Sequence, residues 1–170
     1  MVEALSQYSI RDWVVHHSYG IGQVKKIEKK MIRGEKVACV RVKIKEGAYW
    51  FPTKSADNPR IRPISSQDTL QRAQKELQKT VREFDPDRKM WKRRIDEVRA
   101  GDDMIATSQM VRDFTILKTQ RKSNQTEEKA LNHFAERLIS EWSAMMKTDV
   151  ETIRQQLKGY LRAIRERASV

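Results

Sequence analysis

The spacing of hydrophobic residues changes once along the chain, near Ser65-Ser66. Before that point apolar and polar residues alternate, so that Val40, Val42 and Ile44 share one face of their segment. A period of two is typical of β-strands buried on one side. After that point apolar residues recur at the helical period. The spacing therefore predicts an α+β protein, with strands first and helices second.

The alternating segment, residues 10–64, predicts four or five short antiparallel strands. Turn residues interrupt it at short intervals, as is usual in small all-β domains. These turn signals are Gly20 and Gly22, Arg33-Gly34-Glu35, Glu46-Gly47 and Asn58-Pro59. We expect residues 1–65 to form a small antiparallel β-barrel of the SH3 or Tudor type.

The second segment, residues 66–170, predicts a compact bundle of about five helices. In its last part Val150, Ile153 and Leu157 fall on one helical stripe. Capping residues and a first-turn proline mark five helix starts. They are Ser65 with Asp68, Asp85-Pro86-Asp87, Asp102-Asp103, Thr126-Glu127-Glu128, and Thr148 with Glu151.

The chain is strongly basic, with 35 Lys and Arg against 23 Asp and Glu and a net charge of +12. Both segments carry an excess of basic residues, so the charge belongs to folded surfaces rather than to a tail. Such a balance favours a polyanionic partner, either nucleic acid, an acidic protein face or an anionic membrane surface.

Signals for catalysis are scarce. The three histidines, His16, His17 and His133, lack partners at metal-ligand spacing, and no glycine-rich phosphate loop precedes a helix. We expect no catalytic residue, no metal and no cofactor. Cys39 is the only cysteine, which fits a reducing compartment. No signal peptide or membrane-length apolar run is present, so we expect a cytoplasmic protein without a membrane partner.

Two basic strands in the first segment allow two interpretations. Lysines crowd residues 25–30, and Arg41, Lys43 and Lys45 alternate along another strand. They form either a solvated face that discourages aggregation, or a docking face for an acidic protein or a phosphate backbone. Tyr49 and Trp50 lie in the next strand, and they also allow two interpretations. They are either exposed anchors of an interface or part of the hydrophobic core.

Trp91 also allows two interpretations. It forms an i, i+4, i+7 series with Ile95 and Val98, which favours a buried stripe. However, it lies in the first turn of a helix among five cations, and an apolar wedge beside cations can hold open a distorted minor groove. These cations are Arg88, Lys89, Lys92, Arg93 and Arg94.

The sequence resembles a known family along nearly its whole length. In the first segment, residues 12–24 (DWVVHHSYGIGQV), 32–35 (IRGE) and Phe51-Pro52 resemble the polymerase-interacting domain of CarD/CdnL-type bacterial transcription regulators. Transcription-repair coupling factors share that domain. In the second segment, residues 90–94 (MWKRR) and 110–114 (MVRDF) follow the order of the CarD/CdnL helical domain.

The resemblance implies a non-enzymatic regulator with two partners. Its Tudor-like domain would bind the β subunit of RNA polymerase, partly by strand-to-strand contact. By position, Lys30, Met31 and Ile32 match the polymerase-facing strand, with Trp50 across from them. The helical domain would contact promoter DNA at the upstream edge of the transcription bubble and stabilise the open complex. A monomer associated with the bacterial nucleoid is implied.

In that resemblance Trp91 matches the wedge that enters the minor groove. Its basic neighbours match the phosphate contacts, and these are Arg88, Lys92, Arg93 and Arg94. We therefore expect Trp91 to be exposed while Ile95 and Val98 are buried. The alternative is a sequence-nonspecific nucleic-acid-binding or RNA-chaperone module that acts without polymerase.

Overall fold

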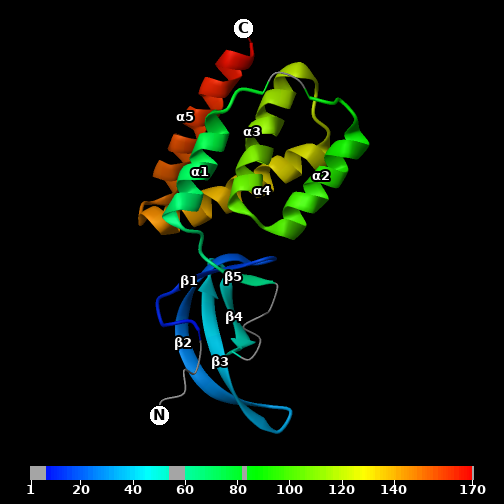
Figure 1. Ribbon diagram of the computed structural model, residues 1–170. Coiled ribbons are helices and arrows are strands. Elements are labelled where there is room, and N and C mark those ends of the chain that lie inside the picture. Colours follow the sequence, from blue (N-terminus) through cyan, green and yellow to red (C-terminus); the bar gives the residue numbers. More distant parts are fainter. Residues whose placement is uncertain (1–6, 54–59, 82–83, 170) are drawn as a thin grey trace. The chain divides into compact units, whose positions relative to one another are not determined.

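The chain divides into two compact units, Met1–Ile64 and Ser65–Val170, in a computed structural model that describes residues 7–53, 60–81 and 84–169 (Figure 1). We call them the sheet unit and the helical unit. In the described residues the first contains five strands and the second five helices. The α+β class, with strands before helices, is confirmed.

The five strands form one antiparallel sheet in the order β4-β3-β2-β1-β5. Among the described residues β4 and β5 are its two edges, so the small antiparallel sheet that we expected is present but is not closed into a complete barrel. The Asn58-Pro59 turn signal lies outside the described residues. The strands are β1 (Trp13–His16), β2 (Gly20–Ile32), β3 (Glu35–Ile44), β4 (Gly47–Pro52) and β5 (Ile61–Pro63).

One glycine allows the long paired strands β2 and β3 to approach each other closely. A side chain at Gly22 would place its Cβ 2.9 Å from the carbonyl oxygen of Lys43, too close for any other residue. A register shift between Val24 and Lys26 then bends β2. The curved sheet encloses a small apolar core of Tyr8, Val14, Val24, Val40, Val42, Phe51 and Ile61.

Short polar side chains cap the start of every described helix, as the sequence suggested, although some caps differ by a residue or two. Ser66 rather than Ser65 caps α1, Asn124 forms the capping box with Glu127 before α4, and Asp149 caps α5. The helices are α1 (Gln67–Gln78), α2 (Arg88–Gly101), α3 (Met104–Gln120), α4 (Gln125–Met146) and α5 (Val150–Ala168).

Helix α3 lies at the centre of the helical unit, in contact with the other four helices (Figure 1). Eleven of its 17 residues are buried. The core around it includes four large aromatic side chains, one from α3 and three from other helices: Phe114, Trp91, Phe134 and Trp142. None of the described helices is long and apolar enough to cross a membrane.

Candidate functional site

The tip of the β2–β3 hairpin is a two-residue turn, Arg33-Gly34. Both residues have positive φ, 49° and 84°. A turn of this kind matches the right-handed twist of the flanking strands, so the pairing continues up to Ile32 and Glu35. We call residues 29–38 the hairpin tip.

The hairpin tip extends beyond the rest of the sheet. Strand β1 pairs with β2 only as far as Gln23, and β4 pairs with β3 only from Cys39 onward. Within the described part of the chain, the tip is therefore a two-stranded ribbon with two free edges. Such edges present unpaired N–H and C=O groups that can accept a strand from another protein.

Three exposed apolar side chains lie on or beside this ribbon. Met31 is 62% exposed, Ile32 38% and Trp50 on the edge strand β4 37%. The ammonium group of Lys30 lies 3.4 Å from the centre of the Trp50 ring. Because side chains alternate along a strand, Lys30 and Ile32 face one side and Met31 the other. The structure thus brings Lys30 and Trp50 together and exposes apolar surface on both faces of the tip.

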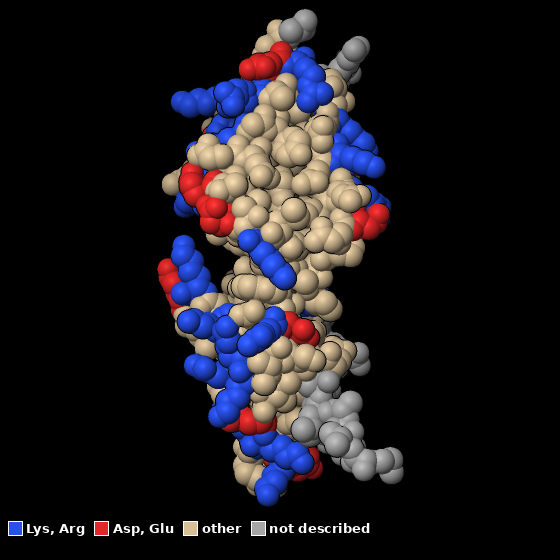
Figure 2. All heavy atoms as spheres, turned by 90° about the vertical axis from the view of Figure 1, so that its left-hand side faces the viewer, with Lys and Arg blue, Asp and Glu red and all other residues tan. Residues whose placement is uncertain are grey.

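Basic side chains gather on one face of the sheet unit. Lys and Arg gather over the sheet unit, with few carboxylates among them (Figure 2). Lys25, Lys26, Arg41 and Lys43 are all exposed. Lys26 pairs with Glu28, which also lies 3.8 Å from Lys30. This face can therefore meet an acidic surface without first losing many internal ion pairs.

At the start of α2, the expectation that Trp91 is exposed is wrong. The side chain is 0% exposed, Ile95 is 3% exposed and Val98 is half-buried. Asp87 caps the helix by accepting a hydrogen bond from the Lys89 N–H at 2.9 Å. In the first turn of α2, the side chain of Trp91 therefore faces the core and does not project beyond the end of the helix bundle.

Trp91 is held in the core on several sides. Its ring centre lies 5.6 Å from that of Phe84 and 5.0 Å from that of Phe114. Its indole N–H donates to the carbonyl oxygen of Asp85 at 2.7 Å. The Arg94 guanidinium lies 5.2 Å from the ring centre. A buried indole with a satisfied N–H is a core anchor that fixes the position of α2.

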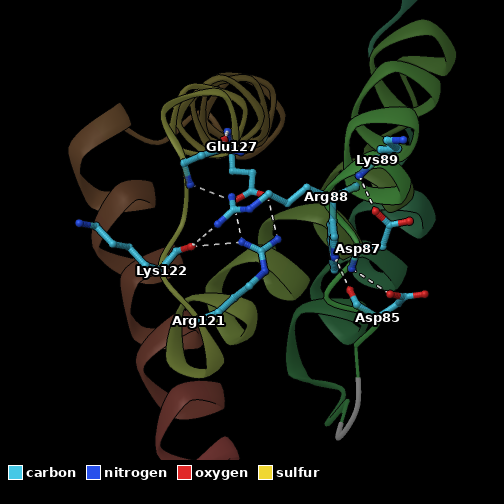
Figure 3. A network of polar contacts seen from close by, with 9 residues as sticks. Asp85, Asp87, Arg88, Lys89, Arg121, Lys122 and Glu127 are labelled. Carbon is cyan, nitrogen blue, oxygen red and sulfur yellow. Dashed lines mark hydrogen bonds and ion pairs between the residues drawn. The ribbon is translucent and has the colours of Figure 1, made fainter.

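Two of the five cations around Trp91 are held by internal ion pairs. Arg88 donates to Glu127 at 3.2 Å and to the carbonyl oxygen of Lys122 at 3.1 Å (Figure 3). Glu127 also accepts two hydrogen bonds from Arg121, at 2.8 and 2.9 Å, while completing the cap of α4. Arg88 thereby connects the start of α2 to the start of α4.

Arg94, the second of these cations, belongs to a buried network that sequence reasoning missed. It donates to Asp113 at 2.5 Å, and Asp113 also accepts a bond from Arg112 at 2.6 Å. Arg112 reaches Glu76 on α1 at 3.1 Å. Arg112 and Asp113 are 7% and 3% exposed. Arg94 therefore joins α2 to α3. The sequence signal for this network was the adjacent pair Arg112-Asp113, which lies among apolar residues of its helix.

The other three cations, Lys89, Lys92 and Arg93, are exposed and make no ion pair with any described residue. A hollow of about 280 Å³ lies beside Arg88, Lys89 and Lys92, between the starts of α2 and α4. This surface is suited to contact with phosphate groups. Of the predicted DNA-contacting residues, Lys92 and Arg93 are free to act in this way.

Because of Glu127, the helical unit is expected to lose stability as the pH becomes acidic. Hydrogen bonds from Arg121 lower the pKa of its carboxyl group below the ordinary value. Because the carboxyl group has a lower pKa in the folded protein than in the unfolded chain, its charged form stabilises the fold at every pH above the unfolded pKa. This stability is lost as pH falls through the lower pKa of the folded protein. At neutral pH, Glu127→Gln should cost about 1–3 kcal/mol, because the charge-assisted bonds to Arg121 are weakened. Urea unfolding at several pH values measures both effects.

The neighbouring residue Glu128 provides the matched control. It also lies in the first turn of α4, but its pair with Lys118 is exposed, at 42% for both side chains. Glu128→Gln should therefore change the unfolding free energy by less than about 1 kcal/mol. The loss of stability on acidification should be smaller in Glu127→Gln than in Glu128→Gln. Equal losses in the two variants would contradict the role given to Glu127.

Comparison with known proteins adds two findings. The CarD-like/TRCF RID domain family matches residues 8–65. A Bacillus subtilis (strain 168) protein named "Putative transcription factor YdeB" is 29% identical over 141 residues, which cover 79% of this chain and 89% of that protein. The first match covers the sheet unit, including the hairpin tip, and the second reaches into the helical unit.

Proposed function

We propose that this chain, whose residues 8–65 match the CarD-like/TRCF RID domain family, is a transcription regulator that binds RNA polymerase and stabilises the promoter open complex. The observation that carries the proposal is the CarD-like domain at residues 8–65, with a hairpin tip whose strand edges and apolar side chains are free.

The sheet unit binds the β subunit of polymerase through the hairpin tip. A strand of the partner pairs with a free edge of the ribbon, so that main-chain hydrogen bonds supply part of the affinity. Met31 and Ile32 cover the two faces of that strand, and the Lys30–Trp50 pair adds an aromatic anchor beside it. The exposed lysines of the sheet favour an acidic partner surface.

The helical unit contacts DNA at the upstream edge of the transcription bubble. Lys92 and Arg93, together with Lys89, supply exposed charge for the phosphate backbone. Arg88 and Arg94 play a different part, since their bonds to Glu127 and Asp113 hold α2 in place. Phosphate contacts of this kind add affinity without sequence preference, so the regulator acts on promoters that polymerase has already selected.

Trp91 positions this basic surface and is not itself presented to DNA. For its ring to enter a minor groove, it would have to leave Phe84 and Phe114 and lose the bond to Asp85. Moving a buried aromatic side chain into water costs several kcal/mol, which groove insertion would have to offset. In this proposal the charge of α2 therefore stabilises the open complex, in place of the tryptophan wedge.

The lifetime of open complexes tests this role. We expect the double variant with Lys92→Ala and Arg93→Ala to increase the lifetime of open complexes less than the unaltered protein does at equal concentration. The apparent affinity for the polymerase–promoter complex should fall on every promoter tested, and its salt slope should decrease by about 1 for each residue. The measurement is dissociation of open complexes in the presence of a competitor, at several salt concentrations.

Lys129→Ala is the control, because Lys129 is exposed on α4 and carries the same charge. It should leave both the lifetime and the salt slope unchanged. If the double variant acts like the unaltered protein, α2 does not contact DNA. If the unaltered protein itself leaves open-complex lifetime unchanged, the proposed function is wrong.

A further inference from the structure

A groove of about 960 Å³ runs between α3, α4 and α5 of the helical unit. It is at the upper end of the size range of ligand-binding pockets. Its lining residues are Thr115, Lys118 and Thr119 from α3, Leu131, Asn132 and Ala135 from α4, and Gln155, Lys158, Leu161, Arg162 and Arg165 from α5.

The groove has an apolar floor. Leu131, Ala135 and Leu161 are partly buried and pack against the hydrophobic core. The hydroxyl groups of Thr115 and Thr119 bond to carbonyl oxygens of their own helix, at 2.7 Å in each case. With their hydroxyl groups satisfied in this way, the threonines do not depend on a polar ligand. The floor is therefore suited to apolar side chains.

The rim of the groove is cationic. None of the described residues that line it is acidic. Lys118 pairs with Glu128, whereas Lys158, Arg162 and Arg165 are exposed and make no ion pair in the described part of the chain. At spacings of four and three residues, these three cations share one face of α5. Their mutual repulsion is relieved by an anionic occupant.

From this pairing of an apolar floor with a cationic rim, we infer that the groove binds an amphipathic helix of a partner protein that carries acidic residues beside its apolar stripe. A helix has a diameter of about 10–12 Å, and such helices commonly place apolar residues into grooves on other proteins. Glutamate or aspartate beside the stripe would meet the three cations of α5.

A DNA duplex fits this groove less well. Its phosphates would satisfy the cations, but a phosphate backbone offers no apolar surface to cover Leu131 and Leu161. None of the residues assigned to polymerase or DNA contact lines this groove, so the inference does not depend on the proposed function.

A synthetic peptide tests the inference. The probe is a Leu/Ala/Glu amphipathic helix of about four turns, and its twin has lysine in place of every glutamate. Nuclear magnetic resonance spectra of the full chain locate binding, and calorimetry measures affinity. We expect the acidic peptide to shift the methyl resonances of Leu131, Ala135 and Leu161, while the basic twin binds at least tenfold more weakly.

Charge reversal on the rim provides the second measurement. Lys158→Glu with Arg162→Glu should weaken binding of the acidic peptide at least tenfold, whereas Lys129→Glu, outside the groove, should not. Circular dichroism confirms that each variant is folded. The inference is overturned if the two peptides bind equally, if the shifts lie outside the groove, or if rim reversal has no effect. It is also overturned if a short DNA duplex shifts the same methyl groups and displaces the peptide.

Discussion

Replacing Trp91 with alanine is expected to lower the unfolding free energy of the helical unit by about 3–5 kcal/mol, the range for large aromatic side chains in cores. The substitution removes a fully buried ring from between Phe84 and Phe114. It also leaves the carbonyl oxygen of Asp85 without its indole donor. Trp91→Phe keeps part of the ring packing and loses the hydrogen bond, so its cost should be smaller.

Urea unfolding followed by far-ultraviolet circular dichroism measures this effect. Trp50→Ala is the control, because Trp50 is 37% exposed and lies in the sheet unit. A substitution at such a surface position usually changes stability by less than about 0.5 kcal/mol. If Trp91→Ala unfolds at the same urea concentration as the unaltered chain, then Trp91 is not a core anchor and the wedge returns as the better hypothesis.

The second large effect concerns the hairpin tip. Trp50→Ala and Met31→Ala together should weaken polymerase binding by about 30-fold or more, because one interface hot spot contributes at least about 2 kcal/mol. Trp50 is the aromatic anchor held beside Lys30, and Met31 is the most exposed apolar residue of the tip. Affinity for purified bacterial RNA polymerase, measured by biolayer interferometry, checks the prediction.

Ile10→Ala is the matched control for the hairpin tip. Ile10 is 58% exposed in the same unit but lies outside the tip. Its substitution should leave polymerase affinity unchanged, and none of the three substitutions should alter the unfolding of the sheet unit. If Ile10→Ala weakens binding as much as the double variant, polymerase binds another face of the sheet. If the double variant binds normally, the tip has no part in the contact.

Local patterns were sufficient to predict the architecture. The change from a period of two to the helical period is a property of neighbouring residues, and so are turn and capping signals. The position of Trp91 in a series with Ile95 and Val98 also indicated correctly that it is core. The resemblance to the CarD/CdnL family, the first-turn position of Trp91 and the five cations around it favoured an exposed wedge instead.

The partners of two of these cations could not be predicted from local sequence. Glu127 lies 39 residues from Arg88, and Asp113 lies 19 residues from Arg94. Only packing of α2 against α3 and α4 brings these carboxylates close enough to neutralise the two arginines. The free edges of the hairpin tip are equally non-local, since they depend on where the neighbouring strands β1 and β4 end.

Binding of the full chain to polymerase and to free DNA tests the central claim most directly. A fluorophore at the N-terminus reports both by anisotropy, and the buried Cys39 is left unmodified. A salt titration separates the two hypotheses, because nonspecific DNA affinity falls steeply as salt concentration rises. We predict tight binding to RNA polymerase that depends on the hairpin tip, and weak binding to a duplex alone. Tight duplex binding with a steep salt dependence, and no binding to polymerase, would contradict the account.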